Sequence, residues 1–209
     1  MVITYHGGEF IKAQVGDMVL AFNPIGKESV WKQSRFGADI AFVTLDDADF
    51  NGIEQVTYGD KTPFVVSGPG EYEVKGIFIK GAYTQTTYHK KLRANTVYAL
   101  TFDDIRIGFL GALPNAEALT GEIKEMLGSV DILFAPIEGG EVLSAGDAHK
   151  IAVALEANIL IPIHYDGVGD TALTALEKEA GEKAEVLEKL TIKRKDLEGK
   201  EGKVIVLTA

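Results

Sequence analysis

The spacing of apolar residues changes character about half-way along this chain of 209 residues. Before Pro114, apolar residues alternate with polar ones or form short runs separated by glycines, which indicates β-strands and turns. After Pro114, stretches with helical spacing alternate with short, continuously apolar runs, which predicts helix–strand–helix–strand. A strand-rich half followed by alternating helices and strands is typical of sheets packed on each other with helices outside.

The expected elements follow this division. The first half is expected to be largely antiparallel, and its last two strands are joined by a tight turn at Asp103 and Asp104. Its strands are predicted over residues 2–5, 10–14, 18–22, 38–44, 64–67, 72–80, 96–102 and 105–110. In the second half, helices are predicted over 116–127, 144–157 and 171–180, and strands over 130–137, 158–165, 187–197 and 203–208. No Pro-, Ser- or Gly-rich linker interrupts residues 1–209, so one domain is expected.

Composition narrows the chemistry that is available to the chain. It has no cysteine, which excludes disulfides and thiolate ligands, so a zinc site would have to use His, Asp or Glu. The net charge of −10 disfavours nucleic acid as a partner. The basic stretch "HKKLR", residues 89–93, is expected to be a solvated loop tip. No signal peptide and no apolar run of roughly 20 residues is visible, so we expect a cytoplasmic protein without a membrane segment.

A loop with three aspartates is the first candidate site. The apolar strand that ends at Val43 runs into "TLDDADFNG", which contains Asp46, Asp47 and Asp49 but no histidine. Carboxylates at a strand end can hold a divalent cation, whereas zinc sites usually add imidazole ligands. The loop therefore fits either a site of reduced metal affinity or a loop braced by its own carboxylates.

Six segments resemble, in the correct order, the metallo-β-lactamase superfamily. They are "MVITYHGGEF", "VTLDDADFNG", "GPGEYEVKGIFIKG", "RIGFLGAL", "DILFAPIEGG" and "ILIPIHYD". The pattern is similar to small bacterial zinc-dependent hydrolase-like proteins near the ascorbate-phosphate lactonase group. The resemblance covers nearly the whole chain and implies an α/β (α+β) protein, a four-layer αββα sandwich with its site at one edge between the two sheets.

The resemblance also indicates which metal ligands are present. The family's T-H-x-H-x-D-H loop falls on residues 44–50, and its H-x-G-D segment falls on residues 109–112. The positions that would carry a ligand in the family but cannot coordinate a metal here are Leu45, Phe50, Phe109 and Ala112. The residual candidates are Asp47, which stands at a histidine position, together with Asp49 and His164, which are retained. A two-metal hydrolytic centre cannot be assembled from this set.

Two functions therefore remain open. The first is a non-catalytic binding or assembly module for an unknown protein or small molecule, with no cofactor expected. The second is a metal-dependent hydrolase, lactonase or phosphoesterase-like, with one ion held by Asp47, Asp49 and His164. Such oxygen-rich ligands suit Mg²⁺ or Mn²⁺ better than zinc. A structural alternative is that Asp49 braces its loop and His164 is a hydrogen-bonded core histidine.

Further candidates are weaker. His6, at the end of the first strand, could replace a missing ligand, and Glu71 could face the pocket as an acid or base. His89 and His149 are expected at the surface without a chemical role. Exposed strand edges in such sandwiches often pair, so a homo-oligomer is also left open.

Overall fold

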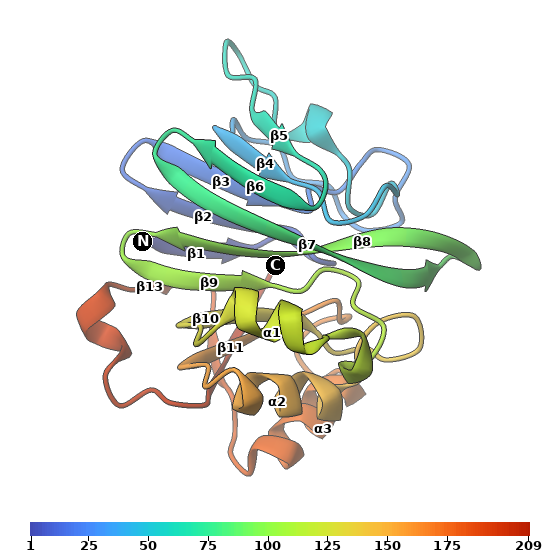
Figure 1. Cartoon of the computed structure of the whole chain (residues 1–209), viewed down its shortest axis with the longest axis vertical. Helices are drawn as coiled ribbons and strands as arrows, with labels where there is room; N and C mark the ends of the chain where they lie inside the picture. Colours follow the sequence, from blue (N-terminus) through green and yellow to red (C-terminus); the bar gives the residue numbers. More distant parts are fainter.

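The computed structural model describes all 209 residues, which form two β-sheets packed face to face with helices outside (Figure 1). The predicted sandwich architecture is confirmed. One sheet has six strands in the order β13-β1-β2-β3-β4-β5, and the other has eight in the order β12-β14-β11-β10-β9-β8-β7-β6. No helix is both long and apolar enough to cross a membrane.

The six-stranded sheet mixes antiparallel and parallel pairs. Its strands are β1 (Val2–Tyr5), β2 (Ile11–Val15), β3 (Met18–Phe22), β4 (Ile40–Phe42), β5 (Phe64–Val66) and β13 (Leu190–Thr191). β1, β2 and β3 pair antiparallel, but β3–β4 and β4–β5 are parallel, so the expected antiparallel first half is wrong at this edge. Parallel neighbours need long crossover connections, and residues 23–39 and 43–63 provide them.

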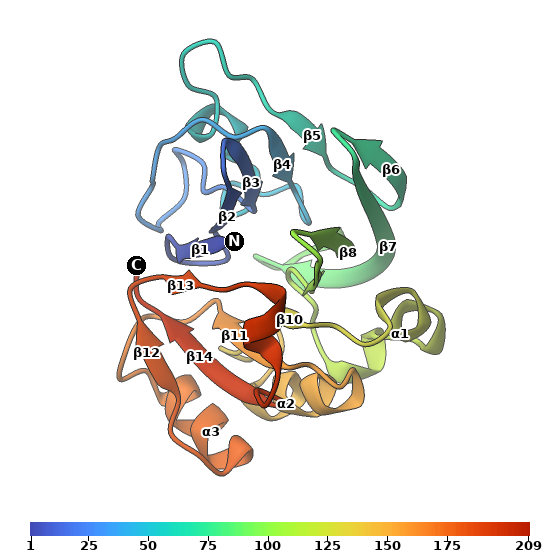
Figure 2. The same cartoon turned by 90° about the vertical axis from the view of Figure 1, so that its left-hand side faces the viewer.

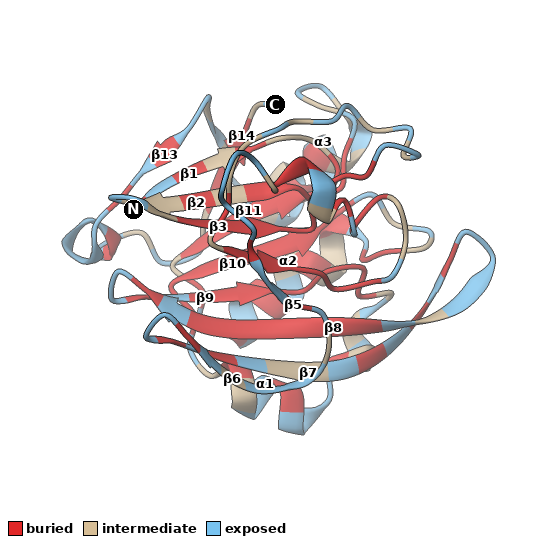
Figure 3. Cartoon of the chain, turned by 90° about the horizontal axis from the view of Figure 1, so that it is seen from above, coloured by how far each residue is buried: buried red, intermediate tan, exposed pale blue.

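The eight-stranded sheet contains the longest strands. Its members are β6 (Gly70–Val74), β7 (Ile77–Tyr88), β8 (Lys91–Phe102), β9 (Ile105–Phe109), β10 (Ile132–Pro136), β11 (Ile159–Ile163), β12 (Glu185–Leu187) and β14 (Lys203–Leu207). The single strand predicted over 72–80 is two strands, because Lys75 and Gly76 both have positive φ and form a tight turn. β7 and β8 continue as a hairpin whose exposed tip extends beyond the body (Figure 3).

Three α-helices lie outside the eight-stranded sheet (Figure 2). They are α1 (Gly121–Leu127), α2 (Ala145–Ala154) and α3 (Thr171–Ala180). The chain also contains three short 3-10 helices, which are η1 (Ile53–Gln55), η2 (Ala116–Ala118) and η3 (Arg194–Leu197). α1 is shorter than predicted because Thr120 acts as an N-cap, its hydroxyl accepting from the Ile123 N–H. The strand predicted over 187–197 is interrupted: it contains the short strand β13 (Leu190–Thr191), and its last four residues form η3.

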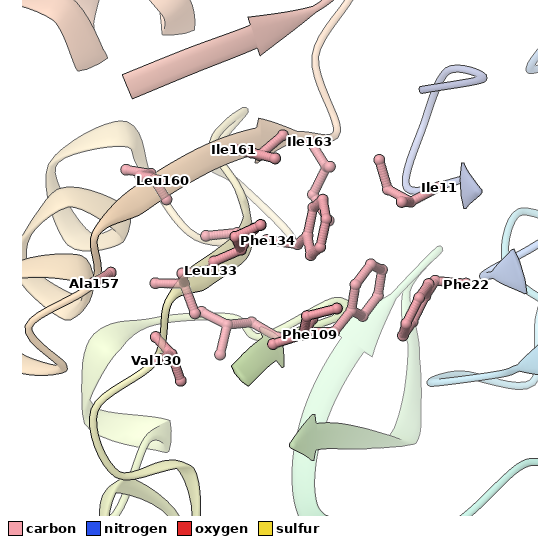
Figure 4. Packing of buried hydrophobic residues seen from close by; sticks show 14 of the residues in the cluster. Ile11, Phe22, Phe109, Val130, Leu133, Phe134, Ala157, Leu160, Ile161 and Ile163 are labelled. Carbon is pink, nitrogen blue, oxygen red and sulfur yellow. The ribbon is translucent and has the colours of Figure 1, made fainter. Parts of the chain in front are cut away.

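Aromatic rings fill the space between the two sheets. Phe22 of β3 stacks on Phe109 of β9 with ring centroids 5.0 Å apart, and Phe109 contacts Phe134 of β10 at 5.7 Å (Figure 4). All three side chains are fully buried. The sheets are therefore held together by a core that does not depend on the loops at their ends.

The other face of the six-stranded sheet is also covered. Val19 and Ala21 of β3 point away from the main core and belong to a second apolar cluster. Its other members come from neighbouring strands and from the irregular segments that cross this face: Phe10, Ile25, Ala38, Ala41 and Val56. Here the outer layer is made of the two crossover segments and η1 rather than of a long helix.

Candidate functional site

Loops that follow several strand ends line a cavity of about 620 Å³ at one edge of the sandwich. Asp49 comes from the loop after β4, and Tyr88 and His89 from the end of the β7–β8 hairpin. His164 follows β11 directly. The remaining lining residues are Val30, Trp31, Glu138, Gly139, Gly140, Glu141, Val142 and Asp166. Asp49 and His164, the two retained candidates, thus line the same cavity.

His164 is buried between two carboxylates. Its Nδ1 lies 3.1 Å from Glu9 Oε1, and its Nε2 lies 3.3 Å from Glu138 Oε2. Burial alone would lower the pKa of His164, but the hydrogen bonds to Glu138 and Glu9 outweigh it and raise the pKa to about 9. The same pair lowers the pKa of Glu138. The raised pKa favours the imidazolium form, in which both ring nitrogens donate to these carboxylates.

Glu9 connects this pair to the sheet below it. It is 1% exposed, and its Oε2 accepts from Asn23 Nδ2 at 2.9 Å. The same Asn23 amide donates to Thr44 Oγ1, and Asn23 Oδ1 accepts from the Thr44 N–H. The buried charge is thus fully hydrogen-bonded, as a carboxylate in this position must be.

Four of the eight non-glycine residues with positive φ lie at this edge. His164 has φ +56° and its N–H donates to the Gly8 carbonyl at 2.6 Å. His89 and Lys90 at the hairpin turn, and Asn23 beneath the cavity, also have positive φ. Non-glycine residues adopt this conformation only when their surroundings enforce it, and such residues cluster at functional sites.

Asp49 is buried, and each of its carboxylate oxygens accepts a hydrogen bond from a hydroxyl. Ser29 Oγ donates to Oδ1 at 2.5 Å, and the Tyr88 hydroxyl donates to Oδ2 at 2.8 Å. Burial and the bond to Asp49 raise the pKa of Tyr88 well above its usual range, so this donor remains protonated. Asp49 thus braces the loop against the β7–β8 hairpin.

Asp47 is neutralised by a cation. Its Oδ2 lies 2.8 Å from Arg93 Nη2, and Arg93 also donates to the Asp46 carbonyl. Its Oδ1 accepts from the Asp49 N–H at 3.3 Å. Asp46 has an exposed side chain that accepts from Asn51 and does not line the cavity.

Three of the four positions without a ligand atom lie together in a small apolar cluster. Leu45, Phe50 and Ala112 pack there with Tyr88 and Val142, and all five are buried. Phe50 meets Tyr88 edge to face, with ring centroids 5.0 Å apart. None of these three side chains has an atom that could bind a metal ion.

The fourth such position is placed differently. Phe109 belongs to the main core between the sheets, where it stacks on Phe22, and is not a member of the small cluster. Its ring therefore stabilises the sandwich rather than the wall of the cavity (Figure 4).

The structure brings a different histidine to the aspartates. One ligand atom each from Asp47, Asp49 and His89 lie within 4.8 Å of one another. His89 Nδ1 is 3.6 Å from Asp47 Oδ2, and its Nε2 is 3.7 Å from Asp49 Oδ2. Each aspartate thus faces a different ring nitrogen, whereas one ion uses only one nitrogen of an imidazole. Arg93 also forms an ion pair with Asp47. In this arrangement the three residues therefore fit a metal poorly.

The remaining predicted candidates lie elsewhere. His6 packs on Phe10 and Phe36, outside the cavity's lining, and burial lowers its pKa to about 4. Glu71 is exposed on the edge strand β6, where it pairs with Lys80, and it does not line the cavity. β6 lies at the end of the sheet opposite β11 and β14. His149 on α2 lines no part of the cavity.

The sequence did not reveal the residues that form hydrogen bonds with Asp49 and His164. Glu9 and Glu138 hold His164, while Ser29 and Tyr88 hold Asp49. One usable signal was the charged Glu9 beside Phe10 at the start of a buried strand, because a carboxylate there needs a buried partner. Ser29 carries no such signal, since a serine in a loop is ordinary.

Comparison with known proteins agrees with this architecture. The model of the β-lactamase superfamily domain matches residues 2–164, most of the chain. The chain belongs to the metallo-β-lactamase superfamily. No curated protein matches this superfamily member.

Solved structures of the superfamily resemble it over almost their whole length. A proposed Zn-dependent hydrolase of Thermotoga maritima is 24% identical, with a TM-score of 0.79, covering 99% of this chain and 97% of that one. A proposed metal-dependent hydrolase of Parabacteroides distasonis is 19% identical, with a TM-score of 0.69 and coverages of 98% and 91%. The metallo-β-lactamase fold protein YhfI of Bacillus subtilis is 13% identical, with a TM-score of 0.63 and coverages of 100% and 96%. At these identities the likeness shows the fold alone.

Proposed function

We propose that this superfamily member is a non-catalytic binding protein whose cavity takes its ligand without a resident metal. One observation carries the proposal: protein groups already engage both ring nitrogens of His164 and both carboxylate oxygens of Asp49. These are the two ligands that the sequence retains. The apolar packing of Leu45, Phe50 and Ala112 supports it further, because the absent ligands are replaced by hydrophobic contacts.

Magnitudes favour this interpretation. A metal could bind His164 only after the ring lost a proton, and a pKa of about 9 makes that unfavourable at pH 7. Two pKa units correspond to about 2.7 kcal/mol, or roughly a hundredfold in metal affinity for this ligand alone. Glu9 and Glu138 would in addition lose their hydrogen-bonded cation, which is costly for the buried Glu9.

A zinc titration tests the proposal. A metal bound only by the folded state raises its melting temperature, so the protein should show no thermal shift with micromolar Zn²⁺. The His164→Ala variant is titrated in parallel. If His164 held a metal, Zn²⁺ would raise the melting temperature of the wild type but not that of this variant. A wild-type increase of several degrees that His164→Ala removes contradicts the proposal.

The alternative function is a metal-dependent hydrolase, lactonase or phosphoesterase-like, with a single remodelled site. The cluster of Asp47, Asp49 and His89 favours it, because a small rotation of the exposed His89 ring would present one nitrogen to both aspartates. A bound ion there would polarise a scissile bond and acidify a water molecule. In this case His89→Ala, and not His164→Ala, removes metal binding measured by equilibrium dialysis.

The choice of partner and cell compartment stays a prediction. An unknown protein or small molecule is the expected partner, nucleic acid and membranes are not, and the cytoplasm is the expected compartment. The net charge of −10 supports the exclusion of nucleic acid. Salt-sensitive retention of RNA or DNA in a filter-binding assay would overturn it. Sedimentation analysis tests the homo-oligomer.

A further inference from the structure

The lining of the cavity carries an excess of negative charge. Four carboxylates, Asp49, Glu138, Glu141 and Asp166, face about 620 Å³ of space that no lysine or arginine lines. Of the two histidines, His164 is already paired with Glu138 and, below the cavity, with Glu9. Even with both histidines charged, the lining residues remain net negative.

Three of these carboxylates, those of Asp49, Glu138 and Glu141, are held in place by hydrogen bonds within the protein. Glu141 accepts from the backbone N–H groups of His89 and Lys90, at 2.9 and 3.3 Å, which fixes it against the hairpin turn. Glu138 is fixed by His164, and its side chain is 50% exposed. Asp166 is exposed, immediately after the buried Tyr165. Glu138 and Glu141 thus have defined positions in the lining of the cavity.

Aromatic side chains form part of the same lining. Trp31 lies edge-on to His164 with ring centroids 5.8 Å apart, and Tyr88 contacts His89 with centroids 4.4 Å apart. Aromatic rings beside carboxylates form the environment that recognises an organic cation, because the ring faces attract positive charge and the carboxylates neutralise it. The volume is within the range of small-molecule sites, about 300–1,000 Å³.

We propose that this cavity binds a small organic cation, an alkylammonium compound, between Trp31 and the carboxylates Glu138 and Asp166. The inference rests on the proposed metal-free function. A cavity loaded with divalent metal attracts anionic ligands, whereas the carboxylates of this one repel them. The lining therefore selects for the opposite charge, and the aromatic walls select an organic cation over a hydrated inorganic ion.

Calorimetric titration with matched probes tests the assignment. Putrescine carries two ammonium groups, 1,4-butanediol has the same chain without charge, and glutarate has a similar chain with two carboxylates. Putrescine should bind at least tenfold more tightly than butanediol, and glutarate should not bind. Choline tests whether a quaternary ammonium is preferred over a primary one. Putrescine affinity should fall as salt rises, because partly exposed charges are screened.

Variants locate the site. Asp166→Asn removes an exposed carboxylate and should weaken the binding of putrescine about two- to fivefold. Trp31→Leu should weaken the binding of putrescine by a similar factor, because the aromatic ring is lost. Asp104→Asn, in the distant β8–β9 turn, is the matched control and should change nothing. Circular dichroism confirms that each variant is folded.

Two results would overturn the assignment. One is equal binding, or no binding at millimolar concentration, of putrescine and butanediol; the other is tighter binding of glutarate. Metal content measured on the same sample separates the two proposals. A metal-free protein that ignores putrescine refutes only the cation site, whereas a stoichiometric metal refutes the proposed function as well.

Discussion

Two neighbouring regions around the cavity satisfy their side chains in opposite ways. On one side lies an apolar cluster that contains Leu45, Phe50 and Ala112. In the pattern of the resembled family, these three positions carry metal ligands. On the other, His164 keeps its place, and its two nitrogens are held by Glu9 and Glu138. The first region buries apolar side chains against one another. In the second region, both nitrogens of His164 are paired with carboxylates. Together they describe how protein groups alone would stabilise this edge under the proposed metal-free function.

The two regions should respond differently to substitution. Loss of an apolar side chain costs its transfer free energy and leaves a cavity, which the surroundings partly fill. Loss of one member of a buried ion pair leaves an uncompensated charge, which the surroundings cannot relieve. The polar side is therefore expected to be the more sensitive one, although it contains fewer contacts.

Glu9→Ala should have the largest effect on stability. It leaves His164 without its buried partner and removes one of the two acceptors of the Asn23 amide, at a cost of about 3–5 kcal/mol in the free energy of unfolding. Urea denaturation at pH 7 measures it. Glu9→Gln, which keeps the volume and an acceptor, should cost less. A loss below about 1 kcal/mol for Glu9→Ala would mean that the pair is not buried as described.

Phe50→Ala probes the apolar side. Removal of a fully buried ring should cost about 3 kcal/mol, while Phe50→Leu, which refills most of the space, should cost about 1 kcal/mol. The same denaturation series gives both values. If Phe50→His proved more stable than Phe50→Leu, the cluster would be a polar site and the comparison between the regions would fail.

The pH dependence of stability isolates the His164 pair. Because its folded pKa is raised from 6.5 to about 9, the pair contributes fully below pH 6.5, and the contribution is lost as pH rises towards 9. The expected decline over this window is of the order of 2–3 kcal/mol. His164→Gln should flatten the decline. A wild-type stability that is level between pH 6.5 and 9 contradicts an imidazolium at this position.

Tyr88 belongs to both regions, and Tyr88→Phe should have a smaller effect than Glu9→Ala or Phe50→Ala. The change keeps the ring in the apolar cluster and removes only the hydrogen bond to Asp49, which should cost about 1–2 kcal/mol. Thermal denaturation measures it, with Tyr83→Phe on the exposed face of β7 as the neutral control.

The fold was largely predictable from the sequence, and the reason lies in its periodicity. Alternation or short apolar runs predicted β1 and β3, while apolar residues at helical spacing predicted α2 and the polar stretch 171–180 predicted α3. The errors are at turns and crossovers. A lysine–glycine pair at residues 75–76 divides one expected strand into two, and parallel pairing of β4 depends on contacts between distant segments that no local pattern records.

The candidate site was predictable only in part. The order of motifs placed Asp49 and His164 at one cavity, as observed. It could not reveal that Glu9, 155 positions earlier in the chain, bonds to His164, because that contact is made by packing the two sheets together. Likewise, His89 was expected to be a free loop tip, yet the hairpin places it 3.7 Å from Asp49 while leaving it exposed.

Zinc content after dialysis is the measurement that tests the central claim most directly. Protein expressed with added zinc and dialysed against metal-free buffer should retain far less than one equivalent by mass spectrometry of the metal. One or two equivalents that survive dialysis, and that are lost on Asp49→Ala, would contradict the account.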